Sequence, residues 1–131
     1  MTLTVDLVSP EAVLYEGEAA MVVARTTSGG DIAFQQGHQP FLGGLGTWPV
    51  RLILDDGGEV RFAVHGGFVE VSGDRVIVLS DVAEVAEGID VERARVAKAA
   101  AEEALRSDPD NEIAAAALAR AQVRLEVAGA S

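Results

Sequence analysis

The spacing of apolar residues changes once along this chain, within residues 81–95. Before this stretch apolar side chains recur at every second position. After it they recur every three or four residues, and alanine becomes abundant. A period of two is typical of strands and a period near 3.5 of helices. The sequence therefore predicts an α+β fold with a β domain over 1–84, a hinge over 85–89 and helices over 90–131.

Two hairpins are the clearest elements of the predicted β domain. The first joins 48–54 to 59–65 through an Asp-Asp-Gly-Gly turn, and the second joins 68–71 to 75–79 through Ser-Gly-Asp. Short strands with turns every eight to twelve residues are typical of a β-sandwich or a flattened barrel. We therefore expect one of these two architectures for the first two thirds of the chain.

The second strand of the first hairpin alternates apolar and polar residues. Successive side chains of a strand point to opposite faces of its sheet. We therefore expect Val60, Phe62 and Val64 to point into the core, and Arg61 and His65 to point outward.

A first helix is predicted from Asp90 to Arg106, where the chain has neither glycine nor proline. Asp90 is a candidate cap for the start of this helix. Residues 107–111 interrupt it. Asp108 as cap, with Pro109 in the first helical position, would begin a second helix.

The second helix is expected to run to about Val127 and to end at Gly129. A break this short between two helices predicts an antiparallel hairpin whose helices are each roughly 25 Å long. Its inner seam would consist of Ala94, Ala97, Ala101, Ala104 and Leu105 against Ala114, Ala117, Leu118, Ala121 and Leu125. Alanine buries little apolar surface, so we expect this hairpin to be held weakly.

The charge balance argues against a nucleic-acid partner. The chain has 10 Lys and Arg against 21 Asp and Glu, a net charge of −11, whereas a phosphate backbone is bound by basic side chains. No apolar run is long enough to span a membrane, and the start of the chain lacks the features of a signal peptide. We therefore expect no direct membrane insertion and a cytosolic protein.

Catalytic motifs are not found. His38 and His65 are the only histidines, there is no cysteine, and neither histidine has a further ligand at metal-binding spacing. The glycines over 43–46 do not lie between a strand and a helix as a phosphate loop requires. We therefore predict neither catalytic residues nor a metal site. A loop histidine beside proline, such as His38, is most often a surface or packing residue.

Arg120 and Arg124 lie one helical turn apart, with no acid three or four residues away in their own helix. Their counter-charge must come from another element. One alternative is a salt bridge to Asp90 or Glu92, which an antiparallel hairpin would bring near Arg124. The other is an anionic ligand bound by Arg93, Arg120 and Arg124 at the start of the first helix.

Four segments resemble one known family. Val8-Ser9-Pro10 followed by Tyr15-Glu16-Gly17 resembles the opening strand and turn of that family. Residues 30–40, Gly-Asp-Ile-Ala-Phe-Gln-Gln-Gly-His-Gln-Pro, resemble its Gly-His-x-Pro segment, and residues 66–71, Gly-Gly-Phe-Val-Glu-Val, match its Gly-Gly-Phe-x-Glu-Val strand. Ile89-Asp90, with Arg93-Ala94, matches its Ile-Asp-x-x-Arg-Ala motif. The family is the ε subunit of bacterial F-type ATP synthase.

The resemblance implies a ten-stranded β-sandwich followed by the helical hairpin. It also implies a place in the rotor, where the sandwich contacts the γ subunit and the c-ring, with Asp31 and His38 in the segment at that contact. Folded on the sandwich, the hairpin would permit turnover. Extended along γ into the α/β catalytic head, it would restrain ATP hydrolysis.

Some members of this family bind ATP in the folded state. Carried over by the matching positions, that site would use Glu84, Ile89, Asp90, Arg93, Ala94, Arg120 and Arg124. ATP would be a regulatory ligand, and no cofactor is required.

The sequence thus predicts a non-catalytic central-stalk subunit, peripheral to the cytoplasmic face of the bacterial plasma membrane. The alternative is a purely structural coupling subunit with a permanently docked hairpin and no nucleotide.

Overall fold

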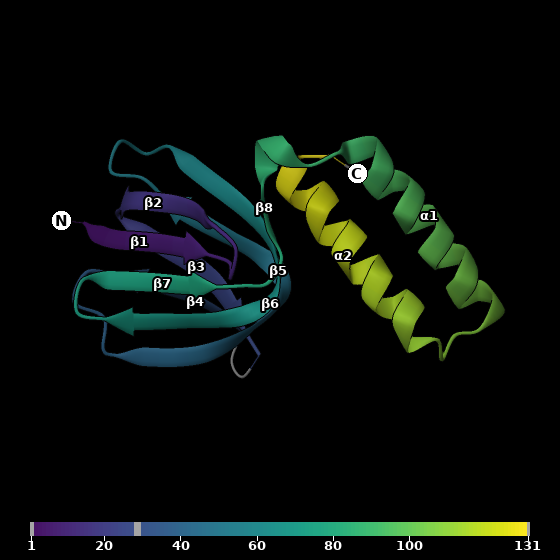
Figure 1. Ribbon diagram of the computed structural model, residues 1–131, viewed down its shortest axis with the longest axis horizontal. Helices are drawn as coiled ribbons and strands as arrows, with labels where there is room; N and C mark the ends of the chain where they lie inside the picture. The colour runs from purple at the N-terminus through teal and green to yellow at the C-terminus, as the bar shows by residue number, and fades with distance from the viewer. Residues whose placement is uncertain (1, 28–29, 131) are drawn as a thin grey trace.

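The computed structural model describes residues 2–27 and 30–130 of the chain. Within them, eight strands are followed by one short 3₁₀ turn and two helices (Figure 1). The strands are β1 (Leu3–Val8), β2 (Val13–Ala19), β3 (Met21–Thr26), β4 (Gly30–Gln35), β5 (Phe41–Ile53), β6 (Glu59–Ser72), β7 (Arg75–Leu79) and β8 (Ala83–Val85). The turn is η1 (Ala86–Gly88), and the helices are α1 (Val91–Ser107) and α2 (Glu112–Ala128).

The strands pair in the order β2-β1-β7-β6-β5-β3-β4, and β8 pairs with the first half of β6. β1 and β7 are parallel, whereas the other neighbours are antiparallel. The sheet encloses one core to which β1, β3, β5, β6 and β7 all contribute. Its largest fully buried side chains are Phe34 and Phe62. The architecture is the expected α+β fold, a β-sandwich with two C-terminal helices.

The predicted number of ten strands differs from the eight in the described residues. β5 and β6 form one long hairpin, and its pairing passes from Leu45–Gly67 to Thr47–His65 without a pair at Gly46 and Gly66. Dividing both strands at this point would give ten. Gly66 and Gly67 have positive φ angles of 84° and 129°, so the chain changes direction here without ending the strand.

The alternation predicted for β6 is confirmed on its inner face. Phe62 and Val64 are 1% and 0% exposed, and Val60 is partly buried against the core. His65 lies on the outer face, as predicted, but this face is not open to solvent and its side chain is only 4% exposed. The outer face of β6 is covered here by α2 and η1, so both faces of this strand are buried.

Both helices begin with a side-chain cap. The Asp90 carboxylate accepts a hydrogen bond from the Arg93 N–H, as predicted for the start of α1. The second cap was predicted incorrectly, since Asn111 rather than Asp108 accepts from the Ala114 N–H and Glu112 is the first residue of α2. Asp108 instead lies at the C-terminal end of α1, where its backbone N–H reaches the Ala104 carbonyl.

The end of α2 is as predicted. Gly129 has a φ of 76°, its N–H donates to the Glu126 carbonyl at 3.0 Å, and the Ala130 N–H donates to the Leu125 carbonyl at 2.8 Å. This pair of bonds satisfies carbonyls that a helix end would otherwise leave unpaired.

The helices pack on each other through small residues. Half of the predicted seam is buried, namely Ala94, Ala101, Ala114, Ala121 and Leu125, and the other half is partly buried. Figure 1 shows α2 between the β-sandwich and α1, with the start of α1 and the end of α2 beside η1. The hairpin is therefore attached to the sandwich through α2 and the connecting segment.

A second and smaller cluster of buried residues joins α2 to the sandwich. It consists of Ala63 from β6, Ile89 from the connection, and Val123 and Val127 from α2. Its members are small or medium-sized, so the apolar area that fixes α2 on the sheet is modest.

Candidate functional site

The seven residues proposed for an anionic ligand lie on β8, in the connection to α1, in α1 and in α2, elements that Figure 1 shows close together. Glu84 is on β8, Ile89 and Asp90 are in the connection to α1, Arg93 and Ala94 are in the first turn of α1, and Arg120 and Arg124 are in the second half of α2.

Glu84 is the centre of the polar contacts at this end. One of its oxygens, Oε1, accepts a hydrogen bond from the Arg124 Nε at 2.6 Å and another from the His65 Nε2 at 3.1 Å. Burial raises the pKa of this carboxyl, but the hydrogen bonds from Arg124 and His65 outweigh burial and hold its pKa below the ordinary value. Glu84 is therefore ionised, and it links the sheet to α2.

His65 was not among the predicted site residues, although it lies next to Glu84. Burial, the largest effect, lowers the pKa of its imidazole, and the charges of Arg124 and Arg120 lower it further, whereas the bond to Glu84 raises it. Its Nδ1 atom is buried without a hydrogen-bond partner. The sequence placed this histidine on the outward face of its strand, but no pattern in it indicated that α2 would cover that face.

The predicted salt bridge from Arg120 or Arg124 to Asp90 or Glu92 does not form. Asp90 caps α1, and Glu92 pairs with Arg95 three residues later in its own helix. Arg124 turns toward the sandwich instead, because α2 is the helix that packs on the sheet. The inference that its counter-charge comes from another element is confirmed, with Glu84 as the partner.

The remaining predicted residues have different environments. Ile89 is buried beneath α2 with Val123 and Val127, and Ala94 is buried. Arg93 is exposed and Arg120 is partly buried. Within residues 2–27 and 30–130, neither of these two guanidinium groups forms an ion pair. Two arginines at the base of the hairpin are thus available to an anion.

Asp31 and His38, the predicted rotor-contact residues, are not brought together. Asp31 is the second residue of β4, whereas His38 follows the turn after the last residue of that strand. The His38 ring packs edge-on against Phe34, with a centroid distance of 4.9 Å, and its Nδ1 is 2.7 Å from the Gln39 carbonyl oxygen. Packing on β4 and a contact within its own loop thus account for the position of His38.

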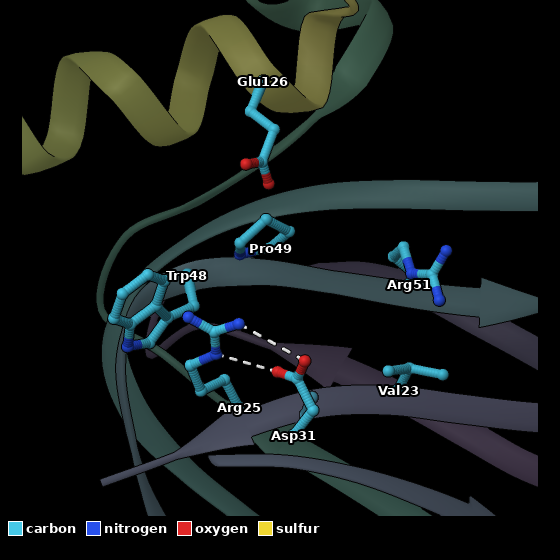
Figure 2. Close-up of a pocket in the computed structure, with 8 residues that line it drawn as sticks. Val23, Arg25, Asp31, Trp48, Pro49, Arg51 and Glu126 are labelled. Atoms are coloured by element: carbon cyan, nitrogen blue, oxygen red, sulfur yellow. Dashed lines mark hydrogen bonds and ion pairs between the residues drawn. The ribbon is translucent and has the colours of Figure 1, made fainter.

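Asp31 faces a groove between the sandwich and α2. Its carboxylate accepts hydrogen bonds from the Arg25 Nε at 2.8 Å and Nη2 at 3.3 Å, and these bonds hold the pKa of Asp31 below its ordinary value. Figure 2 shows the Arg25 guanidinium between Asp31 and the Trp48 ring, with Glu126 reaching down from α2. The guanidinium carbon of Arg25 is 4.2 Å from the Trp48 ring centroid.

The groove continues along α2 past Trp48. This second part has a volume of about 560 Å³ and is lined by Thr47, Trp48 and Pro49 of β5 and by Ala119, Gln122, Val123 and Glu126 of α2. Its two walls belong to different parts of the molecule, so the groove exists only while α2 lies on the sheet. Trp48 is the only tryptophan of the chain, and it is 42% exposed.

Two further properties of the described residues bear on the kind of site. No group of three or more His, Asp or Glu side chains is arranged to hold a metal ion. In the same residues, the helices are too short and too polar to cross a membrane.

These observations define a class of protein: a β-sandwich that carries a C-terminal helical hairpin, attached by one small apolar cluster and one shared carboxylate. The β-sandwich domain of the ATP synthase delta/epsilon chain matches residues 2–86, and the long α-helix domain of the same chain matches residues 87–129. The protein belongs to the family of ATP synthase epsilon chains, which are non-catalytic subunits of that enzyme.

Relatives and solved structures agree with this assignment. The epsilon chain of Streptomyces griseus is 48% identical over 94% of this chain and 92% of its own length. That of Thermobifida fusca is 47% identical over 98% and 93%. A chain in the cryo-EM structure of the Euglena gracilis mitochondrial ATP synthase has a TM-score of 0.73 at 21% identity, covering 98% of this chain and 78% of that one, which supports the fold.

Proposed function

We propose that this protein is the central-stalk epsilon subunit of an F-type ATP synthase. Its sandwich binds the rotor, and its helical hairpin leaves the sandwich to restrain ATP hydrolysis and binds ATP when docked. The observation that carries the proposal is the weak attachment of α2. Four small or medium-sized buried residues and the bond from Arg124 to Glu84 hold α2 on the sheet.

Exposed apolar side chains on the sandwich support a rotor partner. Leu42, Phe68 and Leu79 are 69%, 59% and 48% exposed. Phe68 lies directly opposite Leu79 on β7 and Gly44 on β5, so these side chains share one region of the sheet. A solvent-exposed apolar region of this kind is typical of a surface that another protein covers. We propose that the γ subunit covers it, and that the c-ring contacts the segment of Asp31 and His38.

This assignment can be tested with two variants of similar exposure. We expect Phe68→Ser combined with Leu42→Ser to abolish co-purification with γ, because the contact loses its apolar anchors. Ile113→Ser, on the 83% exposed Ile113 of α2, should leave co-purification intact. Equal binding by both variants would contradict a γ contact at this region.

The charges at the base of the hairpin support ATP as a regulatory ligand. Arg93 and Arg120 have no ion-pair partner among the described residues, and Arg124 shares its only carboxylate with His65. Guanidinium groups bind phosphate oxygens in bidentate fashion. A triphosphate between α1 and α2 would stabilise the docked state by its differential affinity for that state.

The ATP proposal is tested by thermal unfolding of the full chain with and without ATP. We expect ATP to raise the melting temperature of the wild type, and Arg93→Ala or Arg124→Ala to remove that increase. Arg106→Ala, at the opposite end of α1, should retain it. An unchanged increase in the first two variants would exclude these residues from the site.

The alternative is a structural coupling subunit whose hairpin stays docked. The two proposals differ in what happens when the chain is truncated after Gly88 and assembled into the enzyme. If the hairpin restrains hydrolysis, the truncated enzyme should hydrolyse ATP faster than the wild type while γ binding is retained. An unchanged rate with normal assembly would favour the structural alternative.

In the assembled enzyme the subunit would be peripheral to the membrane, on the cytoplasmic face of the bacterial plasma membrane. Its association with the membrane would be indirect, through the c-ring.

A further inference from the structure

His65 lies at the contact between the sandwich and α2, so a change of its charge acts on the interactions that hold α2 on the sheet. Its side chain is 4% exposed, and its Nε2 is 3.1 Å from the Glu84 oxygen that also binds Arg124. A carboxylate can only accept hydrogen bonds, so Nε2 carries the proton of the neutral ring. Nδ1 is then a buried acceptor without a partner.

Protonation would turn Nδ1 into a buried donor with no acceptor and would place a positive charge beside two arginines. The charged groups that act on His65 are Glu84 from β8 and Arg124 and Arg120 from α2. Thr47, its neighbour on β5, is uncharged, and Glu87 of η1 is exposed. Glu84 compensates only in part, because its bonded oxygen already accepts from Arg124.

We propose that His65 makes docking of the helical hairpin proton-dependent, so that protonation of its imidazole releases α2 from the sandwich. Once α2 has left, water can reach both ring nitrogens and the arginines are no longer held nearby. The proposal rests on the mobile hairpin proposed above. It adds acidification as a signal that favours the released, hydrolysis-restraining state.

The direction of the effect follows from proton linkage. Burial lowers the pKa of His65 in the docked state, and the charges of Arg124 and Arg120 lower it further, whereas release removes these effects, so its pKa rises toward the ordinary value near 6.5. Above that value neither state holds the proton, and docking is independent of His65. Below it the released state binds the proton more readily than the docked state, so the docking constant should fall, by up to about tenfold between pH 7.5 and pH 5.5.

Glu84 would weaken docking at a lower pH. The pKa of its carboxyl is held below the ordinary value in the docked state, so its contribution is lost only as the pH falls below about 4.5. The pH at which α2 is released therefore distinguishes the contribution of His65 from that of Glu84.

Docking can be followed in the full chain because it has no cysteine and a single tryptophan. Gln122 of α2 and Trp48 of β5 line the same groove. A bimane dye on Gln122→Cys should be quenched by Trp48 when α2 is docked and should brighten on release. The same labelled chain with Trp48→Phe corrects for any direct effect of pH on the dye.

The decisive comparison uses three chains with this label. We expect the wild-type sequence to brighten between pH 7 and pH 5.5 and His65→Gln, which keeps a donor for Glu84, to lose this step. His38→Gln should retain it.

If His65→Gln brightened over the same pH range as the wild type, the proposal for His65 would be overturned, whereas the mobile hairpin would stand. A step only below pH 4.5 would do the same. No change of fluorescence with pH or with ATP would overturn both this inference and the mobile hairpin on which it rests.

Discussion

Gly67 lies where two backbone segments almost touch. Its φ of 129° is in the region that residues with side chains rarely adopt, and a Cβ placed on it would be 2.0 Å from the Leu79 carbonyl oxygen. The buried Ser80 hydroxyl donates to the neighbouring Gly66 carbonyl at 2.6 Å, which holds the segment after β7 against β6. The backbone therefore has little room to move away from a new side chain.

We expect Gly67→Ala to lower the free energy of unfolding by more than about 3 kcal/mol, because it combines backbone strain with a collision against a carbonyl. Gly88→Ala is the matched control, since its nearest contact would be Val85 Cγ1 at an ordinary 3.5 Å. Urea denaturation monitored by circular dichroism gives both values. Similar stabilities of the two variants would contradict the close approach at Gly67.

Residue-level predictions succeeded where local chemistry decides the outcome. Asp90 and Gly129 act as expected because caps depend on the backbone within a few residues. His65 lies on the outer face as expected, but its burial could not be predicted, because alternation identifies the face of a strand and not what covers that face. The partner of Arg124 was missed for the same reason, since sequence spacing could not show that α2 rather than α1 packs on the sheet.

At the scale of elements, the start of α2 depends on Asn111. Asparagine and aspartate are about equally good caps, so composition alone could not decide between Asn111 and Asp108. Pro109 favoured Asp108, but residues 108–111 form a turn in which the Asn111 N–H donates to the Asp108 carbonyl at 3.1 Å. The helix therefore begins one turn later than predicted.

Replacing this cap should loosen α2 selectively. We expect Asn111→Ala to cost about 1 kcal/mol, because the Ala114 N–H loses its acceptor at 3.0 Å. Amide exchange in the first turn of α2 should become faster. Asp108→Ala should accelerate exchange in this turn less. If Asp108→Ala had the larger effect, Asp108 rather than Asn111 would be the cap of α2.

At the scale of the molecule, the main core is complete without the helices. All of its buried members lie between Leu3 and Val78, and Ala83 of β8 packs against them. The sequence predicted the division into a β part and a helical part because the periodicity differs so clearly. It did not predict the single long hairpin of β5 and β6, because paired glycines resemble a turn between separate strands.

A fragment of residues 1–88 should therefore fold by itself. We expect it to keep the β-sheet circular dichroism of the full chain and to unfold cooperatively. The emission of Trp48 should shift to longer wavelength, because Val123 and its neighbours on α2 no longer shield the ring. A fragment without cooperative unfolding would mean that α2 is required to complete the sandwich.

The equal length of α1 and α2 sets how far the chain can reach. Each has 17 residues and is thus about 25 Å long, and the turn at 108–111 brings the end of α2 back to the linker. If that turn straightened, the last residues of the chain would travel from beside the sheet to roughly 50 Å from it. The conformation of this four-residue turn thus decides whether the hairpin contacts only its own sandwich or can reach a distant subunit.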